Sequence, residues 1–252
     1  MMNAPRRQPE QQAPPVQRLQ VRYAKRGRAR FTSHRDFSRA FERALRRAGV
    51  PMAYSSGFNP HPRISFANAS PTGAATEAEY LEIGLAEAVD PARVREALDA
   101  ALPDGLRVLE VVAAPRGALA ERLTASEWEM TVPGIERAAM ERAVTALLAC
   151  ESLEVERMTK AGLRTFDVRG AVIALSVTGD GFLRLVSAHT TPLVRPDDIL
   201  QALGRVDGGV VASAPPVVTR RSQGRWDGAR IVEPFEDASG ARGGDSVAGM
   251  EE

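Results

Sequence analysis

The feature that most constrains the fold is an order of strand and helix patterns that occurs twice along the chain. Alternating apolar residues indicate a strand, whereas apolar residues three and four positions apart indicate a helix. In the first half these patterns predict strand, helix, strand, strand, helix and strand at residues 19–23, 33–48, 63–67, 80–85, 91–101 and 106–112. This βαββαβ order predicts an α+β unit of the ferredoxin-like kind.

Both helices of this half begin at residues that favour helix starts. Ser33 followed by Asp36 forms a capping pair, and Asp90 before Pro91 combines an N-cap with a first-turn proline. Gly49 then ends the first helix. These local signals support both helix predictions independently of the apolar pattern.

The second half repeats the order with one irregularity. Strand, helix, three strands, helix and strand are predicted at residues 128–132, 135–149, 153–158, 171–177, 182–187, 196–203 and 217–220. Residues 160–170 do not fit the repeat, and either a short helix or an insertion explains them. We therefore expect two tandem ferredoxin-like (βαββαβ) domains, at residues 17–115 and 124–222.

The two ends of the chain are predicted to be disordered tails. Residues 1–16 are rich in Pro and Gln, and residues 223–252 form an acidic, mostly disordered tail in which residues 238–252 have almost nothing to bury. The acidic tail carries three basic and seven acidic side chains, a balance of −4.

Charge is unevenly distributed along a chain of 252 residues whose formal net charge is only +1. Residues 17–69 hold twelve Arg or Lys and two Asp or Glu, a balance of +10. A segment this basic favours an anionic partner, with nucleic acid first and anionic lipid or a phosphorylated ligand second. A well-solvated, arginine-rich surface is the alternative interpretation.

Several classes of protein are excluded by composition. No stretch of about 18 apolar residues is present, so we expect no transmembrane helix, and the first residues lack the apolar segment of a secretory signal. Cys150 is the only cysteine, which excludes a disulfide framework and an iron–sulfur cluster held by this chain alone. We therefore expect a cytoplasmic protein. We also expect no metal site, because the two histidines near the first helix are too few ligands for zinc.

The densest group of unusual side chains flanks the first predicted helix, in segments 28–36 and 55–66. Loops positioned by a rigid scaffold often carry binding groups. We therefore predict that these residues meet an anionic ligand at one cleft beside His34. The candidates are Arg22, Tyr23, Lys25, Arg28, Arg30, Phe31, Ser33, His34, Arg35, Asp36, Gly57, Phe58, Asn59, His61 and Arg63.

His34 is the one candidate for catalysis. It follows the predicted N-cap, where the helix dipole disfavours a charged imidazole. A neutral ring among arginines suits a general base near a phosphodiester, whereas a histidine that only packs at the helix entry is the alternative. His61 lies between two prolines and is more typical of a rigid loop than of a ligand.

A second group of charged residues lies in the second half of the chain. It comprises Lys160, Arg164, Asp167 and Arg169, followed by His189 and Arg195. These residues either line a groove for a phosphate chain or form a solvated face in which Asp167 pairs with an arginine. The sequence leaves both interpretations open.

Three runs of residues resemble a known family. They are Val21-Arg22-Tyr23-Ala24-Lys25, Phe31-Thr32-Ser33-His34-Arg35-Asp36 and Gly57-Phe58-Asn59-Pro60-His61-Pro62. Together with residues 167–169 and 195–200, they resemble the radical-SAM-associated bacterial domain of unknown function. That domain occurs free-standing and also fused behind cobalamin-binding radical SAM proteins, and the similarity covers most of residues 17–222.

The resemblance implies a separately encoded radical SAM protein as partner. That partner would bind the iron–sulfur cluster and S-adenosylmethionine, and this chain would hold no cofactor. Combined with the basic segment, this leads us to expect a non-catalytic accessory protein that binds tRNA or rRNA and presents it for modification. The basic residues would contact phosphates, while Tyr23, Phe31 and Phe58 would stack on unpaired bases. Two alternatives stay open: a metal-independent endoribonuclease with His34 as base, and a purely protein-binding subunit of a radical SAM complex.

Overall fold

The computed structural model describes residues 11–159, 162–179 and 181–236. Residues 1–10 and 237–252, which belong to the predicted tails, lie outside these ranges. The described residues up to 69 and from 79 to 119 form one compact unit, and residues 70–78 with those from 120 onward form a second. Each unit has a hydrophobic core of its own, and the chain is of the α+β class.

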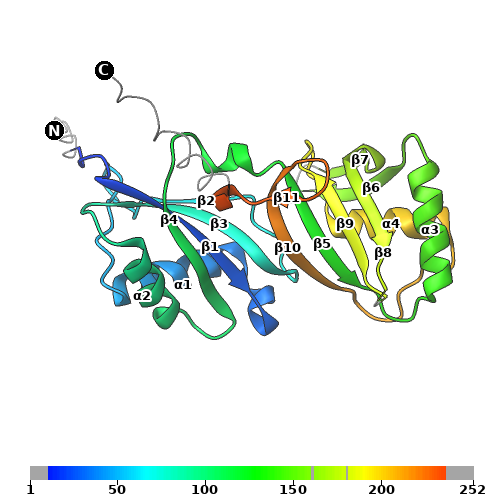
Figure 1. The fold of residues 1–252 in the computed structure, drawn as a ribbon, viewed down its shortest axis with the longest axis horizontal. Helices are drawn as coiled ribbons and strands as arrows, with labels where there is room; N and C mark the ends of the chain where they lie inside the picture. The colour runs from blue at the N-terminus through cyan, green and yellow to red at the C-terminus, as the bar shows by residue number, and fades with distance from the viewer. Residues whose placement is uncertain (1–10, 160–161, 180, 237–252) are drawn as a thin grey trace, which may run out of the picture. The chain divides into compact units, whose positions relative to one another are not determined.

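The first unit contains the βαββαβ order that the sequence predicts. Its strands lie in the order β4, β1, β3, β2, with β1 antiparallel to β4 and β2 antiparallel to β3 (Figure 1). A short 3-10 helix, η1, precedes the first α-helix. The elements are β1 (Gln17–Lys25), η1 (Gly27–Phe31), α1 (His34–Arg47), β2 (Ile64–Ala67), β3 (Ala75–Leu85), α2 (Pro91–Ala101) and β4 (Leu106–Ala113), and η2 (Leu119–Arg122) follows.

Both α-helices of the first unit pack on the same face of its sheet. Side chains at alternate positions of a strand point to one side, so each strand contributes every second residue to the core. The core combines Leu19, Val21, Leu81 and Ile83 of the strands with Phe37 and Phe41 of α1 and Val94 and Leu98 of α2. The side of α1 that faces away from this core is therefore the side that meets solvent.

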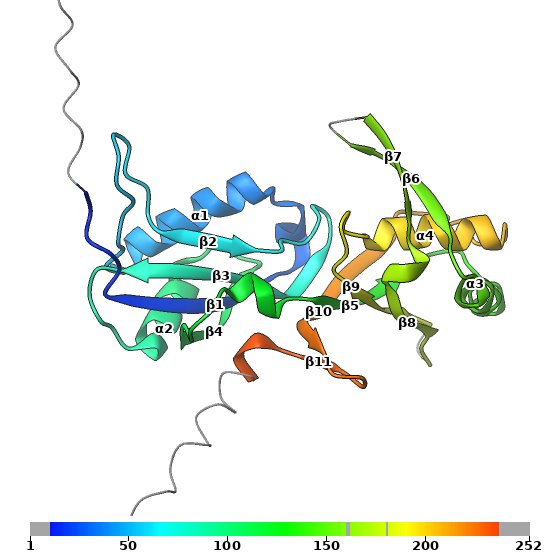
Figure 2. The same ribbon diagram turned by 90° about the horizontal axis from the view of Figure 1, so that it is seen from above.

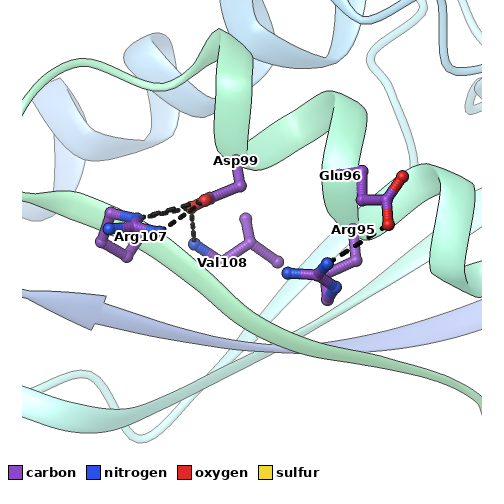
Figure 3. A network of polar contacts seen from close by, with 5 residues as sticks. All are labelled: Arg95, Glu96, Asp99, Arg107 and Val108. Carbon is purple, nitrogen blue, oxygen red and sulfur yellow. Dashed lines mark hydrogen bonds and ion pairs between the residues drawn. The ribbon is translucent and has the colours of Figure 1, made fainter.

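A carboxylate ties α2 to β4 (Figure 3). Asp99 accepts hydrogen bonds from the guanidinium of Arg107 at 2.8 and 2.9 Å and from the backbone N–H of Val108 at 2.9 Å. The hydrogen bond from Arg107 is the main reason why the pKa of Asp99 lies below its ordinary value. Arg107 is thus occupied by a contact within its own unit.

The second unit is built on a mixed sheet. Its main strands lie in the order β10, β5, β9, β8, each antiparallel to its neighbour, and β11 pairs with β10. Ala75 and Thr76, at the start of β3, pair in parallel with β10. The elements are β5 (Ala125–Thr131), α3 (Arg137–Ala149), β6 (Glu154–Thr159), β7 (Gly162–Asp167), η3 (Arg169–Ala171), β8 (Val172–Val177), β9 (Leu183–Ala188), α4 (Pro196–Val206), β10 (Val217–Trp226) and β11 (Ile231–Val232).

The irregular residues of the second half belong to a separate two-stranded ribbon, β6 and β7, between α3 and β8 (Figure 2). Gly162–Asp167 form a strand and Arg169–Ala171 a single 3-10 turn, so the segment is an inserted ribbon; Lys160 lies outside the described residues. Val155 and Phe166 anchor the ribbon to the core that α3 and α4 share. Without the ribbon, the element order repeats that of the first unit.

The beginning of the acidic tail, which we expected to be mostly disordered, is folded. Residues 223–226 continue β10, and Ile231–Val232 form β11 beside it. Ile231 is buried against Ala125 and Val186. A few apolar side chains are therefore enough to fold the beginning of a segment whose overall composition is acidic.

Candidate polyanion-binding site

The basic surface of the first unit is carried by α1, and the sequence fixes this helix at its start. Ser33 is the N-cap: its side-chain oxygen accepts a hydrogen bond from the backbone N–H of Asp36 and its hydroxyl donates to the Asp36 carboxylate at 2.7 Å. Phe37, Phe41 and Leu45 bury the opposite face of the helix in the core. Both features agree with the predictions for this helix.

The solvent-facing side of α1 carries a row of guanidinium groups. Four exposed arginines, at steps of four, four and three residues, fall within an arc of about 80° and extend over about 16 Å of helix. Among the described residues, no carboxylate lies within ion-pair distance of any of them. We call this set the arginine row: Arg35, Arg39, Arg43 and Arg46.

The two acidic residues of α1 do not neutralise the arginine row. The Asp36 carboxylate accepts the hydrogen bond from Ser33, and Glu42 is half-buried at the other border of the row. At the end of the helix, Arg47 donates to the carbonyl of Ala101 at 3.1 Å and so serves the packing of α1 on α2. The arginine row therefore presents an unneutralised positive charge to the solvent.

The 3-10 helix η1 holds an aromatic ring at the start of the row. Phe31 is 60% exposed, and the guanidinium carbon of Arg30 lies 4.7 Å from its ring centroid. The turn is positioned by a 2.7 Å hydrogen bond from the backbone N–H of Arg26 to the carbonyl of Gly105. Gly105 has a φ of +83°, and a Cβ there would lie 2.8 Å from the carbonyl oxygen of Arg26. Glycine is thus required where this loop meets η1.

His34 is exposed and is the first residue of α1. Its ring meets Phe66 of β2 edge-on, with 4.7 Å between the ring centroids, and makes no hydrogen bond to the described residues. A general base is commonly oriented by a hydrogen bond to its second nitrogen. The contact with Phe66 supports the alternative of a packing histidine at the helix entry.

The second candidate segment lies toward the other end of α1. Since the last residues of β2 reach His34, the loop that precedes β2 lies near the helix end (Figure 2). In this loop His61 donates its backbone N–H to the Ser55 hydroxyl at 3.0 Å, and Arg63 donates to the Tyr54 carbonyl at 3.1 Å. The structure thus does not bring Gly57, Phe58, Asn59, His61 and Arg63 together with His34 at one cleft, although Phe58, Asn59, His61 and Arg63 are exposed.

Two candidates on β1 are turned into the protein. Tyr23 is 2% exposed and stacks on Phe37 with 4.4 Å between the ring centroids, so its faces do not reach a ligand. Lys25 is 5% exposed and lies 3.8 Å from the buried carboxylate of Glu79. Arg22 is half-buried on the same strand, while Arg28 on η1 is exposed. Tyr23 and Lys25, which the sequence predicts as binding residues, are therefore not part of the basic surface of the first unit.

In the second unit, the charged candidates hold local structure. Asp167 accepts backbone N–H groups of Leu153, Arg169 and Gly170, and although burial acts to raise its pKa, these hydrogen bonds bring that pKa below the ordinary value. Arg169 donates to the carbonyls of Leu148 and Val172.

The remaining second-unit candidates lie on other elements. Arg195 precedes α4 and donates its backbone N–H to Asp198 at 2.7 Å, while Arg164 is exposed on β7. Lys160 is outside the described residues. A groove for a phosphate chain along this group stays a prediction.

The sequence reasoning missed three members of the arginine row as site residues. Arg39, Arg43 and Arg46 entered only the charge balance of residues 17–69. The signal that identifies them is the four-residue step from Arg35, which places side chains on one helix face.

Two absences hold for the described residues. No group of three or more His, Cys, Asp or Glu side chains is arranged to hold a metal ion. No helix in these ranges combines the length and the apolar character needed to cross a membrane.

Fold and site together define an α+β protein with a basic helix face on its first unit. The chain belongs to a bacterial family that is described as an uncharacterized protein conserved in bacteria (DUF2344), whose model matches residues 18–196. This agrees with the expected bacterial domain of unknown function. No curated protein matches the chain.

Proposed function

We propose that this protein binds RNA through the arginine row and serves as a non-catalytic accessory protein that presents tRNA or rRNA to a separately encoded radical SAM enzyme. The observation that carries the proposal is the row itself: four exposed guanidinium groups on one helix face with no carboxylate in ion-pair range among the described residues. Such a face gains free energy from a polyanion by displacing condensed counterions.

Nucleic acid fits this face better than a lipid surface does. A helix that lies in a membrane interface buries its apolar side among acyl chains. The apolar side of α1 is committed to the core of its own unit through Phe37, Phe41 and Leu45. Guanidinium groups are also suited to phosphate because they donate in a planar fork.

The accessory role assigns the cofactors to the partner. The iron–sulfur cluster and S-adenosylmethionine would be bound by the radical SAM protein, and this chain would bind and orient the RNA in the cytoplasm. The single cysteine supports this division, because one thiolate does not hold a cluster.

We also propose that both units are ferredoxin-like domains. The support is the strand order β4, β1, β3, β2 in the first and β10, β5, β9, β8 in the second, each with two helices sharing one core. On this view the second domain carries the β6–β7 ribbon as an insertion.

The test is the binding of a fluorescently labelled bacterial tRNA mixture to the full chain, measured by anisotropy against salt concentration. The R39E/R43E variant is compared with R137E/R142E, which makes the same change of net charge on exposed arginines of α3. We expect R39E/R43E to weaken binding at least about 100-fold and the control to stay within about threefold. Salt-independent binding by the wild type, or equal losses in both variants, would remove the proposal.

The same samples separate the alternatives. Cleavage of the RNA in EDTA that is lost in H34A would replace the accessory role by that of an endoribonuclease. Co-purification with the radical SAM protein, without RNA binding at any salt concentration, would replace it by that of a protein-binding subunit.

A further inference from the structure

We infer that the RNA held by the arginine row is single-stranded and that one of its unpaired bases stacks on Phe31. This inference rests on the proposed function and adds the class of RNA. It comes from the position of one exposed aromatic ring relative to the row.

Phe31 differs in exposure from the aromatic side chains that pack in the core of the first unit. Tyr23, Phe37 and Phe41 are at most 2% exposed and form a stacked series in the core. Phe31 is 60% exposed, four residues before the first arginine of the row. A rigid ring that stays in water gains free energy when a flat apolar surface covers it.

The ring is held in place rather than carried on a free loop. It ends η1, which is fixed to Gly105 by the Arg26 hydrogen bond and is followed directly by the cap of α1. Arg30 lies over the ring at 4.7 Å, and its Nε is buried without a hydrogen-bond acceptor among the described residues. A cation beside an accessible aromatic face is the combination that binds a base together with its phosphate.

The arginine row begins beside this ring, and the spacing of its arginines suits an extended nucleic-acid strand. Successive arginines rise by about 6, 6 and 4.5 Å along α1. The first two steps are close to the separation of neighbouring phosphates in a nucleic-acid strand. The Asp36 carboxylate at the helix start disfavours a phosphate at the helix N-terminus, so the phosphates follow the side chains.

A duplex does not use both features. Its base faces are covered by stacking inside the helix, so only its phosphates would meet the row and Phe31 would stay in water. A single strand or an open loop offers an unpaired base to Phe31 and several phosphates to the row. The chemistry on the surface therefore favours the single-stranded form.

The test compares a 12-nucleotide RNA without self-complementarity with the same RNA annealed to its complement. Binding by the wild type, F31A and F31W is measured at equal salt. L163A is the matched control, because Leu163 is also an exposed apolar side chain, at 58%, but lies on β7 of the second unit. Since both side chains are exposed, neither alanine variant removes core packing.

We expect the wild type to bind the single strand at least about tenfold more tightly than the duplex. F31A should weaken single-strand binding about five- to 100-fold and leave duplex binding within about twofold, F31W should restore the affinity, and L163A should bind as the wild type does. The inference is overturned if the duplex binds as tightly as the single strand, if F31A binds like the wild type, or if L163A loses as much as F31A.

Failure of this inference is distinguishable from failure of the proposed function. If R39E/R43E abolishes binding but duplex and single strand bind alike, the basic row stands and the stacking site falls. If neither RNA binds in a salt-dependent manner, the proposed function itself falls.

Discussion

The two units of this protein use the same residue type in different ways. On α1 of the first unit, the arginine row points to solvent with no carboxylate in ion-pair range among the described residues. In the second unit, arginines pair with carboxylates: Arg157 meets the buried Asp198 at 2.5 Å, and Arg221 meets Glu129 at 2.6 Å on the surface. The charge of a paired guanidinium group is balanced within the protein, whereas a row without acidic neighbours is available to a ligand.

The difference explains why net charge alone locates the site poorly. Arg137 and Arg142 on α3 are also exposed, but they pair with Glu141 and Asp207. A surface of alternating charges is largely neutral at the distance of a phosphate. For locating an anion-binding surface, the number of arginines is therefore less informative than the distance from each guanidinium group to the nearest carboxylate.

The largest effect on stability is expected for removal of an internal partner. R157A leaves the carboxylate of Asp198, which is 5% exposed, without its guanidinium and should lower the free energy of unfolding by about 3 kcal/mol. R39A removes an exposed side chain and should change it by less than about 0.5 kcal/mol. Urea denaturation of both variants tests the contrast, and equal losses would show that the two sets of arginines do not differ.

A smaller loss is expected where η1 is positioned. G105A introduces a side chain at a φ of +83° and within 2.8 Å of the Arg26 carbonyl oxygen, which should cost about 2 kcal/mol of unfolding free energy. G117A is the control, because Gly117 also has a positive φ but nothing lies near its Cβ position. Thermal unfolding is the measurement, and similar midpoints for both variants would mean that Gly105 makes no close packing contact.

A single member of the arginine row should contribute modestly to RNA binding. R39A is expected to weaken binding about fivefold and to reduce the slope of log affinity against log salt by about 0.7 to 0.9, which corresponds to one lost phosphate contact. R142A is the control on α3 and should leave the slope unchanged. Anisotropy titrations at four salt concentrations give both slopes, and a lower slope in R142A would place part of the binding face on the second unit.

The smallest effect concerns pH and belongs to the second unit. His189 makes hydrogen bonds to the Leu123 carbonyl at 2.6 Å and the Ser126 hydroxyl at 2.8 Å, and burial, aided by the charge of Arg220, lowers its pKa below the ordinary 6.5. The folded state thus binds this proton less readily than the unfolded state. Its stabilising contribution is full above about pH 6.5 and is lost as the pH falls through the folded pKa. H189Q should show a flatter dependence of unfolding midpoint on pH below 6.5, and an unchanged dependence would exclude His189 as the cause.

Local signals in the sequence were enough to predict most elements of the first unit. Ser33 with Asp36, and Asp90 with Pro91, mark the helix starts that the structure contains. The alternation of β1 did not reveal which of its polar residues face inward. A bulge between Arg22 and Tyr23 shifts the register, and Lys25 meets Glu79 far along the sequence. Such pairing is set by tertiary contacts and leaves no local pattern.

The sequence predicted the helix that carries the candidate binding surface but not how far that surface extends. Arg35 and the aromatic Phe31 were identified, and the four-residue spacing of Arg39 and Arg43 was present in the sequence. The separation of the loop around Phe58 from His34 follows from the length of α1 and the return of β2 along it. A charge count over a segment carries no information on that separation.

The chain leaves its first unit for nine residues and then returns to it. Ala75 and Thr76 pair with Thr219 and Arg220, near the end of the described chain. During synthesis, the first residues of β3 therefore wait for partners made about 140 residues later, a delay of about 7 to 28 seconds at about 5 to 20 residues per second. Ribosome-bound chains halted before β10 should hence expose an unpaired strand edge and attract chaperones until the final strand emerges.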